Sequence, residues 1–157
     1  MHNIKESADA KYYKWNIVVI LIILGSILLL TLLITLPYVD KIGSDEILKV
    51  FLIIGLPFIV IFMLVIIYLV YRYLGVIKYK NYIFYETVLN KPVSFFRAMY
   101  FEVEIKCEDG KVKKYDTRAI FYPGFFGPTL LDNYVNKKVI IAINEEIDKA
   151  IVVKVIE

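Results

Sequence analysis

The chain has 157 residues, of which 59% are hydrophobic and 22% are charged, and its formal net charge is +3. Apolar residues make up about 45–50% of an ordinary soluble domain, so this composition excludes that class for the chain as a whole. The single cysteine, Cys107, excludes an intrachain disulfide and agrees with a reducing compartment.

Two apolar runs, residues 17–36 and 50–71, contain no Lys, Arg, Asp or Glu. About 20 residues of helix cross a bilayer core, and backbone amides in lipid must be satisfied within their own segment. The alternatives are buried core helices and, for the first run, a signal peptide. The rest of the chain is too short to bury both runs, and a signal-peptide core has only about 7–15 residues. We predict a transmembrane hairpin over residues 15–73 with an external loop at 37–46.

Basic residues flank both runs on the same side of this hairpin. Lys5, Lys11 and Lys14 precede the first run, and Arg72, Lys78 and Lys80 follow the second. Because basic flanks stay on the cytoplasmic side, we expect a multi-pass protein of the inner or plasma membrane with both termini in the cytoplasm. Residues 1–14 are polar and are expected to form a frayed cytosolic tail.

Residues 75–157 have a different pattern, in which short β-branched and aromatic runs alternate with turn residues. Closing the sheet would remove its exposed edges. We therefore expect a cytosolic, small antiparallel β-barrel of the OB or SH3-like kind, and the predicted fold class is membrane α+β. The predicted strands are residues 76–79, 82–89, 98–107, 112–119, 138–144 and 150–156.

The third predicted strand has the clearest alternation, which places Val103 and Cys107 on the core face and Glu104 in water. A two-residue turn at 109–110 would set Lys114 opposite Ile105. A longer turn with Gly110 in the left-handed region sets Glu104 opposite Lys114, and this second register is preferred because it pairs opposite charges. Residues 130–135 are expected to form a short helical turn.

The sequence offers no set of residues for catalysis. The only histidine is His2, so histidine-based nucleophile systems and His-ligated metal sites are not expected in the β domain. Glu102 and Glu104 share one strand face, where a solvated charged surface is favoured over acid–base work. We expect no enzymatic activity, no cofactor and no metal.

Basic residues in the β domain allow a second hypothesis, an anion-binding site. Its candidate contacts are Lys106, Lys113, Lys114 and Arg118. Positive and negative charges are nearly balanced in residues 75–157, which argues against a nucleic-acid surface.

The most distinctive segment, residues 122–128, combines two glycines and two prolines with exposed-looking aromatic side chains. Three interpretations remain open: a hydrophobic lid on the barrel, insertion of Phe125 and Phe126 into the membrane interface, or binding of a partner or ligand. The candidate partner or membrane contacts are Tyr122, Phe125 and Phe126.

Three short motifs carry a resemblance: Asp-Gly-Lys at 109–111, Lys-Lys-Val-Ile-Ile-Ala-Ile at 137–143, and Lys-Ala-Ile-Val-Val at 149–153. With the two spans, they make the chain similar to bacterial membrane proteins that end in a small β-barrel domain of unknown function, loosely like the NfeD-type barrel. This resemblance implies a barrel fold and a non-enzymatic, interaction-type role. The architecture also resembles bacterial antiphage effectors that join two membrane helices to a nucleotide-sensing β-barrel.

The sequence therefore supports two functional hypotheses. In the first, a non-enzymatic, membrane-anchored scaffold or protective module uses its β domain to engage a protein partner, or a second copy, at the inner membrane surface. In the second, a ligand-gated effector senses an anionic, nucleotide-like signal with its barrel and oligomerises in the bilayer.

Overall fold

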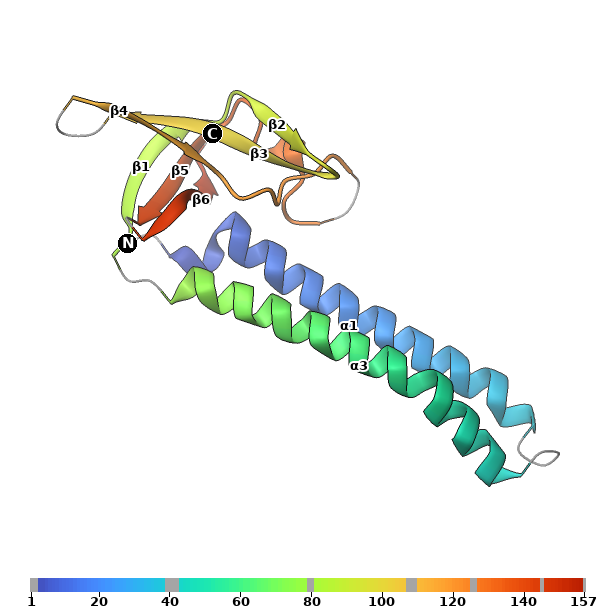
Figure 1. Ribbon diagram of the computed structural model, residues 1–157. Coiled ribbons are helices and arrows are strands. Elements are labelled where there is room, and N and C mark those ends of the chain that lie inside the picture. The colour runs from blue at the N-terminus through green and yellow to red at the C-terminus, as the bar shows by residue number, and fades with distance from the viewer. Residues whose placement is uncertain are drawn as a thin grey trace. The chain divides into compact units, whose positions relative to one another are not determined.

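The computed structural model describes residues 3–38, 43–78, 81–106, 110–124, 127–144 and 146–156 (Figure 1). The chain divides into two compact units. One, the helical hairpin, comprises Asn16–Arg72; the other, the β unit, comprises Met1–Trp15 together with Tyr73–Glu157. Cys107, which was expected to face the core, lies outside the described residues.

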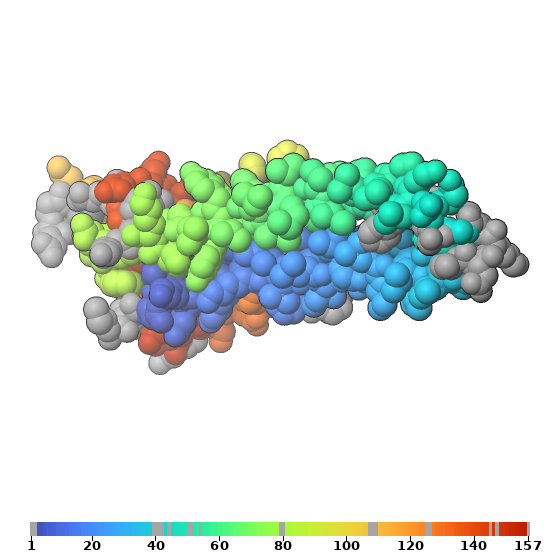
Figure 2. Space-filling model, turned by 90° about the horizontal axis from the view of Figure 1, so that it is seen from below, coloured from blue at the N-terminus to red at the C-terminus, as the bar shows by residue number. Residues whose placement is uncertain are grey.

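Two long helices account for the apolar runs. Helix α1 (Ala8–Thr35) follows the 3-10 turn η1 (Ile4–Glu6) and leads into the 3-10 turn η2 (Leu36–Tyr38), and helix α3 covers Ser44–Ile77. Figures 1 and 2 show α1 and α3 side by side. Both are long and apolar enough to cross a membrane.

The predicted strand at 76–79 is wrong, because α3 continues to Ile77. The backbone N–H of Lys78 donates a hydrogen bond to the Leu74 carbonyl over 2.9 Å and closes the last helical turn. Extending an existing helix adds one hydrogen bond for each residue fixed, whereas a new strand must find a partner strand. Val76 and Ile77 are therefore helical, although both are β-branched.

The six described strands form two three-stranded antiparallel sheets, ordered β1-β5-β6 and β2-β3-β4. Strand β2 was not predicted from the sequence, whereas the strand expected at 138–144 is confirmed. The strands are β1 (Ile83–Val88), β2 (Pro92–Phe95), β3 (Ala98–Lys106), β4 (Val112–Asp116), β5 (Lys138–Asn144) and β6 (Ile147–Val155).

The described strands do not close into a barrel, which corrects the predicted fold. Strand β4 ends at Asp116, short of the predicted residue 119. The Thr117 hydroxyl accepts a hydrogen bond from the Phe101 N–H over 2.8 Å, and so takes the place of a backbone acceptor in the ladder. Directly after β4, one parallel bridge between Thr117 and Ala150 of β6 links the two sheets.

The predicted register of the β3–β4 hairpin is confirmed. Val103 lies opposite Tyr115 and Glu104 opposite Lys114. Gly110 has a φ of 78°, in the left-handed region that glycine adopts without a steric cost. A 3-10 turn, η3 (Leu131–Asn133), lies within the segment expected to be helical.

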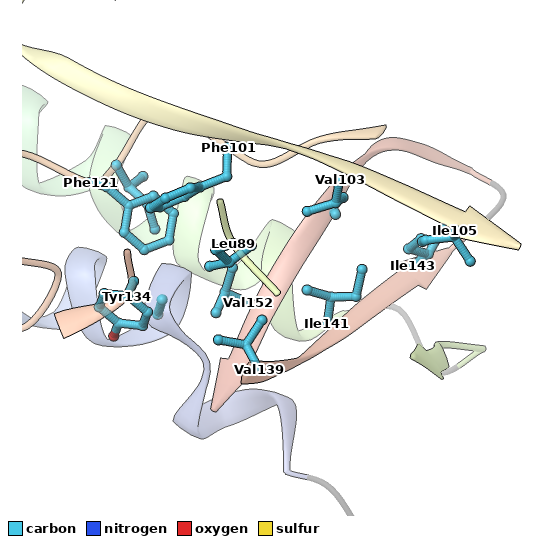
Figure 3. Close-up of a cluster of buried hydrophobic side chains, with 13 residues drawn as sticks. Leu89, Phe101, Val103, Ile105, Phe121, Tyr134, Val139, Ile141, Ile143 and Val152 are labelled. Carbon is cyan, nitrogen blue, oxygen red and sulfur yellow. The ribbon is translucent and has the colours of Figure 1, made fainter. Parts of the chain in front are cut away.

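Side chains from both sheets meet in one core (Figure 3). Strand β5 is buried along its length after Lys138, as expected for the central strand of its sheet. Figure 3 shows Val103 of β3 across from Ile141 of β5. The Phe121 ring packs edge-to-face against Phe101 and Tyr134, with centroid distances of 4.9 Å in both pairs. Each such ring contributes roughly 1.5–3 kcal/mol by leaving water.

The N-terminal segment belongs to this core and is not the expected frayed tail. Ala8 is part of the hydrophobic cluster, and Ala10 and Tyr13 are also buried. Ser7 begins the helix, because its Oγ accepts a hydrogen bond from the Ala10 N–H over 3.2 Å. Residues far apart in the sequence therefore fold together in the β unit.

Candidate functional site

A polar groove of about 660 Å³ opens beside the β3–β4 hairpin. Its walls come from the end of β1, the connection to β2, and strands β3 and β4. The antiparallel register sets Glu102 opposite Asp116 and Glu104 opposite Lys114, so that four charged side chains share one face of the sheet. Lys91 adds a cation from the β1–β2 connection. The groove therefore presents both signs of charge to solvent.

Ion pairs organise the charges of this groove. The Lys114 Nζ lies 2.9 Å from the Glu104 Oε1, and the Lys149 Nζ lies 3.7 Å from the Asp116 Oδ2. The hydrogen bond and positive charge of Lys114 lower the pKa of Glu104, and Glu104 in turn raises the pKa of Lys114. Because both side chains are exposed, this pair contributes little to the stability of the fold.

The four candidate anion contacts do not converge. Successive residues of β4 face opposite sides, so Lys113 points away from the face that carries Lys114. Lys106, paired with Val112, shares the face of Lys114 but lies two residue pairs closer to the turn. Arg118 follows β4 and contacts the N-terminal segment. The anion site therefore stays a prediction, with only two of its four candidate side chains on one face.

A buried ion pair joins the N-terminal segment to the β sheets. The Arg118 Nε lies 3.4 Å from the Asp9 Oδ1, and the side chains are 16% and 1% exposed. Asp9 stands in the first turn of α1, where the helix dipole favours a negative charge. The sequence interpretation missed this pair, although Ser7 followed by Ala8 and Asp9 is a recognisable helix start.

Tyr134 lies in the same part of the core. Burial of its ring, followed by the negative charge of Asp9, raises the pKa of the Tyr134 hydroxyl. That hydroxyl donates a hydrogen bond to the Pro128 carbonyl over 3.3 Å. The Tyr134 hydroxyl therefore ties the backbone at Pro128 to the core.

Within that segment, Tyr122 packs inside the β unit. Its ring meets Tyr12 at a centroid distance of 6.3 Å, and its backbone bridges to Leu130. Gly127 has a φ of 115°, and a Cβ there would collide with the Tyr122 hydroxyl. Tyr122 thus fixes the turn. Phe125 and Phe126, the other two candidate contacts, lie outside the described residues.

An exposed aromatic pair at the β2–β3 turn was missed by the sequence interpretation. Phe95 is 56% and Phe96 94% exposed. Their rings form an edge-to-face pair with a centroid distance of 5.2 Å. The only available signal was the Phe-Phe-Arg run itself, because the turn contains none of the residues that usually mark a hairpin.

In the described parts of the chain, His, Cys, Asp and Glu side chains form no group of three or more that could hold a metal ion. Comparison with protein-family models, with curated proteins and with solved structures finds no match to this chain.

Proposed function

We propose that the chain is a non-enzymatic, membrane-anchored binding module. Helices α1 and α3 form two transmembrane spans, and the β unit lies in the cytosol and engages a protein partner at the inner surface of the cell membrane. The spans are supported by helices of 28 and 34 residues, longer than the roughly 20 residues needed to cross a bilayer. Large apolar side chains lie exposed along both helices, which suits contact with lipid.

The proposed orientation places both ends of the hairpin in the cytosol, as the distribution of lysine and arginine favours. Cations lie beside aromatic rings at these helix ends. The Lys14 Nζ is 5.5 Å from the centroid of the Tyr73 ring, and the Arg72 guanidinium is 6.0 Å from that of Tyr68. Rings and cations of this kind prefer the headgroup level of a membrane.

The observation that carries the partner proposal is the polar groove beside β3 and β4. It offers carboxylates and ammonium groups side by side, on two strands whose backbone register is defined. Side chains of both signs on a rigid sheet suit a polar protein segment with complementary charges. An anionic ligand has less support, because Glu104 already neutralises Lys114 and Asp9 faces Arg118.

Photocrosslinking in native membranes tests this proposal. A crosslinking amino acid replaces Glu102 in the groove, and a matched control carries it at Ile156, an exposed residue beyond the end of β6. We expect a specific protein adduct from position 102 only, and its loss when Asp116→Lys reverses a charge in the groove. If groove positions form no adduct, or both positions form the same one, the partner proposal is wrong.

A further inference from the structure

The β2–β3 hairpin ends in an unusual turn. Phe95 pairs with Ala98, which leaves Phe96 and Arg97 as a two-residue loop. Phe96 has a φ of 53°, in the left-handed region. Gly, Asn and Asp occupy this conformation in most tight hairpin turns, whereas a bulky side chain there is strained. Strained residues of this kind cluster at functional sites of proteins.

The aromatic side chains of this turn are exposed to solvent. Phe96 is 94% exposed and Phe95 56% exposed, and the two rings contact each other instead of the core. The Arg97 side chain, next in the chain, is also exposed. Single exposed apolar residues are common on proteins, but two adjoining rings at a strained tip beside a cation form a compact surface patch.

The covalent connections limit what this tip can reach. Helix α3 ends at Ile77 and β1 begins at Ile83, and the six Cα-to-Cα steps between these two residues span at most roughly 20 Å. Helix α1 also runs unbroken from buried Ala8 in the β unit into its apolar run. The short connection therefore keeps the β unit close to a bilayer that holds both helices.

We propose that Phe95 and Phe96 insert into the headgroup region of the bilayer that holds the spans, and that Arg97 contacts anionic lipid phosphates there. The inference rests on the proposed membrane anchoring. Aromatic rings prefer the membrane interface, and a neighbouring arginine complements the negative inner leaflet. The patch is a tip and not a groove, which suits insertion between headgroups better than docking of a protein segment.

Fluorescence of the full-length protein in lipid nanodiscs tests the inference. Trp15 is the only tryptophan, so the Trp15→Phe background leaves a single probe after Phe96→Trp. Phe95→Trp is a second probe if the first variant folds poorly. The matched control is Val112→Trp, which is 50% exposed and lies at the opposite end of β3 from the tip.

In nanodiscs with anionic lipid, we expect emission from position 96 to shift to shorter wavelength and to be quenched by lipids brominated near the headgroup. The control should remain accessible to acrylamide in water. Arg97→Glu should reduce the lipid quenching in anionic but not in zwitterionic nanodiscs.

Acrylamide-accessible probes at both 95 and 96 would overturn the inference, as would a shift that depends on the number of protein copies per nanodisc, which indicates self-association. Extraction of membranes with carbonate distinguishes a failure of tip insertion from a failure of the proposed membrane anchoring. A water-exposed tip on a carbonate-resistant protein refutes only the insertion, whereas extraction of the protein by carbonate refutes the anchoring itself.

Discussion

The buried pair of Asp9 and Arg118 gives a quantitative test of how the N-terminal segment is held. The Asp9 side chain is 1% exposed and the Arg118 side chain 16% exposed, so Asp9→Ala leaves a largely buried guanidinium without this carboxylate. Removing one member of a buried ion pair costs about 3–5 kcal/mol. Because Arg118 keeps some contact with water, we expect the lower end, about 3 kcal/mol, which is roughly a 100-fold change in an equilibrium constant.

Hydrogen exchange of the full-length protein in detergent micelles measures this loss. In the Asp9→Ala variant, we expect the amides of residues 8–15 to exchange roughly 100-fold faster. The matched control is the double variant Asp9→Asn with Arg118→Met, which removes both charges at similar volume and should recover most of the protection. An acceleration of less than about threefold in Asp9→Ala would refute the reasoning, because it would mean that the segment is solvated.

Three further predictions concern the β unit, and denaturant or thermal unfolding followed by circular dichroism measures each of them. Phe96→Asn should raise the free energy of unfolding by about 1 kcal/mol, because asparagine tolerates the left-handed conformation; a decrease would show that the turn is not strained. Gly127→Ala should lower the free energy of unfolding by about 1–3 kcal/mol, since φ is 115° and the new Cβ meets the Tyr122 hydroxyl; Tyr122→Phe should recover part of this loss, and an unchanged stability would contradict the close approach. The third prediction concerns pH. The pKa of Tyr134 is raised in the folded state, so above about pH 10 the unfolded chain releases this proton more readily and stability falls as pH rises. Tyr134→Phe should make the loss of stability with rising pH less steep. An equally steep loss in that variant would show that other groups cause the pH dependence.

Local patterns were sufficient to predict the β3–β4 hairpin. The alternation along β3 identifies its buried face, and the opposite charges of Glu104 and Lys114 select one of two registers. Gly110 supplies the left-handed residue that this register requires. Each of these signals lies within a few residues of the turn, so no knowledge of the rest of the fold is needed.

The β2–β3 hairpin was not predictable in the same way. Phe96 adopts a conformation that its side chain disfavours, and the turn lacks the glycine or asparagine that would mark it. Strand β2 begins at Pro92, a residue that normally argues against a central strand. Here β2 lies at the edge of its sheet, where a missing backbone donor is tolerated. The candidate tip was missed because its local signals contradict its structure.

The N-terminal segment shows a different limit, because composition does not distinguish a solvated polar residue from a buried one that has found a partner. Ser7 and Asp9 are both buried. Ser7 caps α1, and the Asp9 Oδ1 makes an ion-pair contact, not a hydrogen bond, with Arg118 from a distant part of the chain. Buried polar groups need such partners, and only the fold brings this arginine to the helix start. The Ser-Ala-Asp-Ala run does predict where the helix begins, because a serine cap and an acidic first turn satisfy the free amides there. A helix start at Ala8, ahead of the apolar run, already argues against a frayed tail.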